Sequence, residues 1–79
     1  MTLNEFINHI KHNSLRIRIY FYQDIDEFEE YHEELWSDTV GGYKTSVIKS
    51  HIGECDVVTI HPFNWDGGFN IFIDKEGAK

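Results

Sequence analysis

The chain has 79 residues and carries 14 acidic residues against seven Lys and Arg, which gives a formal net charge of −7. This balance argues against a nucleic-acid-binding or anionic-membrane-binding protein, because both need a basic surface, and it favours a basic protein partner. The length predicts one domain over residues 1–79, with a core that contributes only about 3–5 kcal/mol.

Three absences bear on where the protein is expected to work. A single cysteine, Cys55, excludes an internal disulfide and fits a reducing compartment. The N-terminal residues lack the apolar run of a signal peptide, and no stretch approaches the ~18 apolar residues of a membrane span. We therefore expect a soluble, cytoplasmic protein.

Two elements are predicted at the start of the chain. Residues 2–11 fit a short helix, because Thr2 and Glu5 have the spacing of a capping box. Its apolar face would contain Leu3, Phe6, Ile7 and Ile10. Residues 15–22 alternate strictly and predict a strand. One face would carry Leu15, Ile17, Ile19 and Phe21, and the other Arg16, Arg18, Tyr20 and Tyr22.

Residues 24–37 predict a second helix with one acidic side. At about 100° per residue, one arc contains Ile25, Phe28, His32, Leu35 and Trp36. The opposite arc contains Asp26, Glu27, Glu29, Glu30, Glu33 and Glu34. A strand is disfavoured here, because Phe28 and Trp36 would share a face with acids. The residues Val40-Gly41-Gly42 are expected to end this helix.

The C-terminal half predicts a hairpin. Residues 43–53 fit a short helix ended by Gly53, with a short strand as the alternative. Residues 55–61 and 69–73 predict strands, with Pro62 at the end of the first. Residues 64–68, NWDGG, supply the turn between them. Residues 75–79 are expected to form a loose tail.

Together these elements predict an α+β fold. We expect a small three-stranded, mostly antiparallel sheet with two to three helices packed on one face. Its strands would contribute a core of Leu15, Ile17, Ile19, Phe21, Val58, Ile60, Phe69, Ile71 and Ile73.

The acidic run is the main functional candidate. Eight acids and no Lys or Arg lie between Asp24 and Asp38. On a helix, its eight like-charge pairs three or four residues apart would cost about 2–4 kcal/mol before salt screening. A solvated helix face is the plain alternative, but this cost favours a surface that docks into a cationic groove. The predicted partner-binding residues are Asp26, Glu27, Glu29, Glu30, Glu33, Glu34, Asp38 and, as an exposed aromatic anchor, Trp65.

The second sheet face would combine cations with aromatic side chains. Such a mixture is typical of single-strand nucleic-acid platforms. Packing or self-association is favoured instead, because a three-stranded sheet that is covered on one side exposes the other. The predicted homodimer face is Tyr20, Tyr22 and Phe72. Trp65 has its own alternative, which is to fold back over the sheet edge.

No catalytic residue, cofactor or metal ligand is predicted. The five histidines and Cys55 do not have tetrahedral zinc spacing, and no D-x-D-x-D-G calcium loop is present. No nucleophile elbow, phosphate-binding loop or carboxylate pair accompanies them. We therefore expect a protein that is not an enzyme.

The whole chain resembles a class of proteins in type rather than by a shared motif. A short helix from Thr2 to Lys11 leads into an Ile-rich strand from Leu15 to Tyr22, and then comes the acidic run DIDEFEEYHEEL. In these features the chain resembles the small acidic α/β proteins that phages encode against bacterial defence, above all anti-CRISPR proteins. The resemblance implies a stoichiometric, non-catalytic inhibitor acting in the host bacterial cytoplasm. The Ile-rich, Ala-poor composition indicates an AT-rich genome, which favours a Cas9 as target.

Two hypotheses follow. The first is an inhibitor that binds a nucleic-acid-handling bacterial defence effector, such as a CRISPR–Cas nuclease, through a helix face that mimics nucleic acid. It needs no direct contact with nucleic acid or membrane. The alternative is a small acidic protein-binding or regulatory module without mimicry, for which both a monomer and a homodimer stay open.

Overall fold

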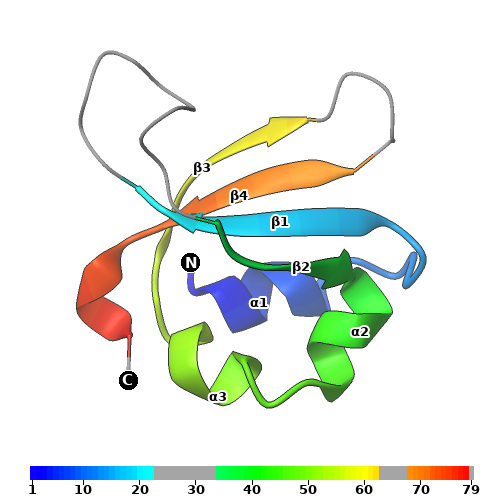
Figure 1. Ribbon diagram of the computed structural model, residues 1–79, viewed down its shortest axis with the longest axis horizontal. Coiled ribbons are helices and arrows are strands. Elements are labelled where there is room, and N and C mark those ends of the chain that lie inside the picture. Colours follow the sequence, from blue (N-terminus) through cyan, green and yellow to red (C-terminus); the bar gives the residue numbers. More distant parts are fainter. Residues whose placement is uncertain (23–33, 63–67, 79) are drawn as a thin grey trace.

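A computed structural model describes residues 1–22, 34–62 and 68–78 (Figure 1). In chain order the elements are α1 Leu3–Asn8, β1 Arg16–Phe21, β2 Glu34–Thr39, α2 Val40–Thr45, α3 Lys49–Ile52, β3 Val57–Pro62, β4 Phe69–Ile73 and the 3-10 helix η1 Lys75–Gly77. The predicted α+β class is confirmed. Among these residues, no helix is long and apolar enough to cross a membrane.

The sheet has four strands in the order β2-β1-β4-β3, instead of the three that were predicted. β1 pairs in parallel with β4, while β1–β2 and β3–β4 are antiparallel pairs. The sheet is therefore mixed, with β1 and β4 at its centre. The predicted antiparallel pairing of the last two strands is confirmed, and the predicted helices on one face are seen in Figure 1.

The prediction of a helix over 24–37 is wrong for residues 34–37, which belong to β2. Ile19 pairs with Trp36 while Tyr20 pairs with Glu34, so Leu35 is the extra residue of a β-bulge. The bulge lets Leu35 and Trp36 both pack against the core, which a regular strand does not allow. Two adjacent apolar residues therefore gave this strand the appearance of a helix. Residues 24–33 of the predicted helix lie outside the described residues.

The first helix and strand agree with prediction. Thr2 caps α1: its hydroxyl accepts a hydrogen bond from the Glu5 N–H at 3.2 Å, and the Glu5 carboxylate accepts one from the Thr2 N–H at 3.1 Å. β1 buries Ile17 and Ile19 and exposes Arg16 and Arg18, as its alternation predicts.

Residues 40–53 form two short helices in place of the predicted single one. Val40, Gly41 and Gly42 begin α2 rather than ending an element, because Thr39 caps this helix through a hydrogen bond from the Gly42 N–H to its hydroxyl. Gly53 ends α3 as expected.

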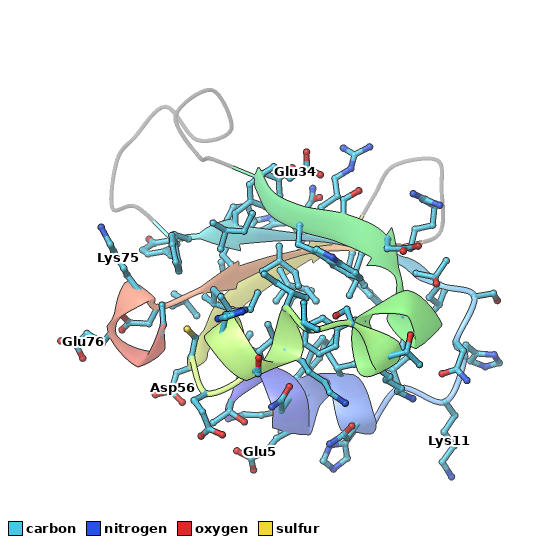
Figure 2. All side chains as sticks on the ribbon, turned by 60° about the horizontal axis from the view of Figure 1, so that its bottom comes forward. Glu5, Lys11, Glu34, Asp56, Lys75 and Glu76 are labelled. Carbon is cyan, nitrogen blue, oxygen red and sulfur yellow. The ribbon has the colours of Figure 1, made fainter. Side chains whose placement is uncertain are left out.

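One core joins the helices to the inner face of β1 and β4. It consists of Leu3, Ile7, Ile17, Ile19, Val40, Tyr43, Ile52, Cys55, Ile71 and Ile73. Trp36 packs edge-on against Tyr43, with ring centroids 5.6 Å apart. The helices that supply this core lie together on one side of the sheet (Figures 1 and 2).

Two further predictions are wrong. Val58 is 46% exposed instead of buried, because a bulge between Val57 and Thr59 turns Val57 to the core and leaves Val58 outside. Lys75–Gly77 form η1 rather than a loose tail. η1 packs closely against the backbone of Glu54 and Cys55, which precede β3. A Cβ on Gly77 would lie only 2.7 Å from the Cys55 Cα atom.

The capping box predicts a pH-dependent stability. The hydrogen bonds from Thr2 lower the pKa of Glu5 below its ordinary value, so its contribution is present above that ordinary value and is lost as pH falls through the lowered pKa. Glu5→Gln should therefore destabilise the protein at pH 7 and match the wild type at low pH. Thr2→Ala should cost about 1 kcal/mol at pH 7. Urea unfolding across this pH range tests both; an equal Glu5→Gln penalty at all pH values would contradict the first.

The tight approach of η1 predicts a cost for adding one methyl group. Gly77→Ala would push a Cβ to within 2.7 Å of two backbone atoms, the Cys55 Cα and the Glu54 carbonyl oxygen. We expect about 1–3 kcal/mol of destabilisation in urea unfolding. Glu76→Ala, on the exposed side of the same turn, is the control and should change stability by less than about 0.5 kcal/mol. Equal stabilities of the two variants would contradict the packing of η1.

Candidate functional site

The predicted acidic surface is only partly within the described residues. Glu34 and Asp38 lie on β2, and Figure 2 shows Glu34 projecting from this strand. The prediction that Glu34 belongs to a helix face is therefore wrong. The remaining predicted partner-binding residues are outside the described part of the chain: Asp26, Glu27, Glu29, Glu30, Glu33 and Trp65.

The net charge is concentrated between β1 and β2. The sequence places six acids and no Lys or Arg between Asp24 and Glu33. By contrast, the described ranges 1–22, 34–62 and 68–78 contain seven acids and six Lys and Arg. The described part of the chain is thus nearly charge-balanced.

The connection that carries these acids is longer than the strand pairing requires. β1 ends at Phe21 and β2 begins at Glu34, and the two strands are antiparallel neighbours. Neighbours of this kind are usually joined by about two to five residues. Here residues 22–33 join them, so most of the connection is additional to what closes the sheet.

Glu34 and Asp38 have different surroundings although they share β2. Glu34 is exposed and lies opposite Tyr20. Asp38 is at the start of α2, where its carboxylate accepts a hydrogen bond from the Thr39 N–H at 2.7 Å. The same carboxylate lies over Gly42, since a Cβ there would be 2.6 Å from Oδ2. Asp38 thus has a local role at the N-terminus of α2.

The outer face of the sheet contains a row of aromatic rings. Tyr20 stacks on Phe72 with ring centroids 5.1 Å apart, and His61 meets Phe72 edge-on at 5.4 Å. Phe72 is 1% exposed, whereas Tyr22 is 38% exposed. Of the three residues predicted to form a dimer face, Phe72 is therefore covered within the chain. The homodimer stays a prediction that depends on Tyr22 and Tyr20.

One polar atom on the same face lacks a partner. Asn70 lies between Arg18 of β1 and His61 of β3 in the strand register. Among the described residues, its Oδ1 atom is the buried side-chain oxygen or nitrogen that has no hydrogen bond. The outer face of the sheet therefore contains a buried polar atom beside its aromatic rings.

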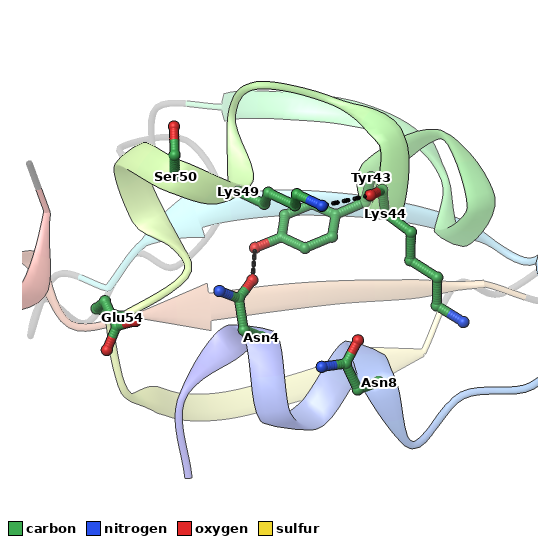
Figure 3. A pocket seen from close by; sticks show the side chains of 7 residues that line it. All are labelled: Asn4, Asn8, Tyr43, Lys44, Lys49, Ser50 and Glu54. Atoms are coloured by element: carbon green, nitrogen blue, oxygen red, sulfur yellow. Dashed lines mark hydrogen bonds between the residues drawn. The ribbon is translucent and has the colours of Figure 1, made fainter.

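The helix side carries a pocket that the sequence did not reveal. It has a volume of about 310 Å³ and lies where α1, α2 and α3 meet (Figure 3). Polar side chains contribute to its lining, which includes Asn4, Asn8, Tyr43, Lys44, Lys49 and Glu54, and about half of the pocket surface is apolar. These residues are spread over 51 positions of the sequence, so no local motif could have indicated the pocket.

Burial raises the pKa of two side chains of the core, those of Tyr43 and Cys55. Burial raises the pKa of Tyr43 far above its ordinary value, and the hydroxyl donates a hydrogen bond to Asn4 Oδ1 at 2.8 Å. Burial also raises the pKa of the Cys55 thiol. Within the described ranges, no group of three or more His, Cys, Asp or Glu side chains is placed to hold a metal ion.

Comparison with known proteins gives no relative for this chain. No protein-family model matches it, no curated protein matches it, and no solved structure matches it.

The local role of Asp38 leads to a prediction that separates the two acids of β2. Asp38→Ala removes a carboxylate from the N-terminus of α2 and should cost about 0.5–1 kcal/mol in urea unfolding. Glu34→Ala, on the same strand, should change stability by less than about 0.5 kcal/mol. Asp38→Asn retains an acceptor for the Thr39 N–H and should fall between these two. A larger effect of Glu34→Ala than of Asp38→Ala would contradict this assignment.

Proposed function

We propose that the protein is a non-catalytic inhibitor that binds a basic, nucleic-acid-handling protein through the acidic connection between β1 and β2. The observation that carries this proposal is the distribution of charge. Residues 24–33 hold six acids without a Lys or Arg, while the described part of the chain has seven acids and six cations. The excess of negative charge thus lies in one short stretch of the sequence between β1 and β2.

The chemistry of the partner follows from that of the connection. Carboxylates accept charge-assisted hydrogen bonds from Lys and Arg side chains, and the guanidinium group of Arg can donate two such bonds to one carboxylate. A groove that normally holds phosphates offers cations of this kind in a row. The resemblance to anti-CRISPR proteins makes a CRISPR–Cas nuclease such as Cas9 the proposed target.

The position of Glu34 changes the proposed mode of binding. A single helix face with six carboxylates no longer describes the candidate, because Glu34 is on an edge strand. The proposal now concerns the acids of one connection, namely Asp26, Glu27, Glu29, Glu30 and Glu33, with Glu34 at its C-terminal end. Association should be fast and should weaken with salt, because complementary fields steer the encounter.

A pair of variants with equal net charge tests the proposal. The first replaces Glu27, Glu29 and Glu30 by Gln. The second replaces three exposed acids from the described part of the chain, Glu54, Asp56 and Glu76, by Gln or Asn. Competition between the protein and DNA for purified Cas9 is then measured at two salt concentrations. The first variant should lose roughly tenfold or more in apparent affinity, and the second should stay close to the wild type.

Three outcomes would overturn the proposal. Unchanged DNA binding by the effector at saturating protein would exclude competition with nucleic acid. Equal losses for the two variants would show that overall charge, rather than the connection, determines binding. A dimer that Tyr22→Glu dissociates, together with no binding to the effector, would favour the regulatory module instead; sedimentation at several concentrations measures it.

A further inference from the structure

The helix-side pocket is independent of the acidic connection and has a different chemistry. Its volume of about 310 Å³ is at the lower end of the ~300–1,000 Å³ typical of small-molecule sites. Two lysines and one glutamate line it, so its charged side chains sum to a positive charge in a protein of net charge −7. A positively charged pocket in a negatively charged protein favours an anionic ligand.

The pocket wall is held in place before any ligand arrives. The Tyr43 side chain is buried, and its hydroxyl donates to Asn4 Oδ1 at 2.8 Å. Asn4 is also packed against Gly53, because a Cβ on Gly53 would lie 2.2 Å from Asn4 Nδ2. The Asn4 carboxamide therefore has its oxygen occupied by Tyr43, and the N–H groups of its Nδ2 atom are its remaining polar atoms.

Lys44 and Lys49 both have N–H donors that are not used in hydrogen bonds within the described part of the chain. An ammonium group has three N–H donors. Lys49 Nζ donates to the Lys44 carbonyl oxygen at 2.8 Å, which leaves two. Lys44 Nζ donates to the Ile10 carbonyl oxygen at 2.9 Å and to Asn13 Oδ1 at 3.0 Å, which leaves one. Both ammonium groups are thus positioned by backbone oxygens and can still bind a ligand.

Asn8 completes this group of donors. It lies one helical turn after Asn4, and Figure 3 shows both carboxamides rising from α1 toward α2 and α3. The Asn8 carboxamide has no hydrogen-bond partner within the described part of the chain. Lys49, Asn4 and Asn8 therefore present N–H donors from two elements to one space, whereas the carboxylate of Glu54 is the acidic group of the lining.

From this arrangement we propose that the pocket between α1, α2 and α3 binds a small oxyanion, a carboxylate or a phosphate, with Lys49 as its main charged contact. Asn8 and Asn4 donate to the remaining oxygens of the ligand, and Tyr43 forms the wall behind them. Glu54 repels the ligand and limits its affinity.

An NMR titration of the full 79-residue chain tests the site. Sodium phosphate and sodium succinate are added in separate arms at constant pH and ionic strength, and glycerol is the neutral probe. We expect saturable shifts of the Asn4 and Asn8 side-chain amides and of the Lys49 and Ser50 backbone amides with at least one anion. The arm that saturates at the lower concentration identifies phosphate or carboxylate as the preferred group.

Variants with matched charge changes make the test specific. Lys49→Ala should weaken anion binding at least about tenfold. Lys75→Ala removes the same charge from the exposed η1 turn and should bind as the wild type does. Glu54→Gln should tighten binding about two- to fivefold, because it removes the repelling carboxylate. Should Lys49→Ala fail to fold by circular dichroism, Asn8→Ala serves in its place, with an expected loss of about threefold.

Two results of the NMR titration would overturn the proposed anion site. Shifts that do not saturate, or that are equal in Lys49→Ala and Lys75→Ala, would mean that anions act on the protein only through bulk ionic effects. An absence of shifts around Asn4, Asn8 and Lys49 with both anions would exclude an oxyanion site. Neither result would affect the proposed inhibitor function, whose decisive variant replaces Glu27, Glu29 and Glu30 and is tested on purified Cas9.

Discussion

The parallel pairing of β1 with β4 is the constraint on which the rest of the molecule depends. Antiparallel neighbours can be joined by a tight turn, but parallel neighbours require a crossover that leaves the sheet and returns. In this chain the crossover contains β2, α2, α3 and β3, which leaves both edge positions to β2 and β3. The helices of the crossover cover the inner face, where Ile17 and Ile19 of β1 meet Ile71 and Ile73 of β4.

The N-terminal helix completes this layer through backbone hydrogen bonds. α1 has only six residues, too few to be stable on its own in water. Its first turn is held by the Leu3 N–H, which donates to the Cys55 carbonyl oxygen at 2.8 Å. The Val57 N–H in turn donates to the Met1 carbonyl oxygen at 2.9 Å. These bonds fix α1 beside the end of α3, and they thereby place Asn4 and Asn8 opposite Tyr43 and Lys49.

The sequence predicted those elements whose signals are local. The capping box at Thr2 and the alternation of residues 15–22 both depend on neighbouring residues, and both predictions are confirmed. β2 could not be predicted in this way, because its bulge places Leu35 and Trp36 on the core side together. The parallel register of β1 and β4 joins segments about 50 residues apart, so no pattern within either strand specifies it.

The same distinction separates the two candidate sites. The acidic connection was visible in the sequence because its charges are adjacent, whereas the pocket combines residues of three helices and has no local pattern. Phe72 was also predicted to be exposed. Strand alternation shows which face of the sheet a side chain occupies, but not whether that face is covered. The stacking with Tyr20 and the 1% exposure of Phe72 are properties of the assembled sheet.

The charge of the chain is unevenly divided along the sequence, since residues 24–33 contain six acids without a Lys or Arg while the described ranges are nearly balanced. The register of β1 with β2 is set by the core contacts of Ile19 and Trp36, which lie outside the connection. The concentration of six acids between Asp24 and Glu33 is the feature on which the proposed cationic partner rests.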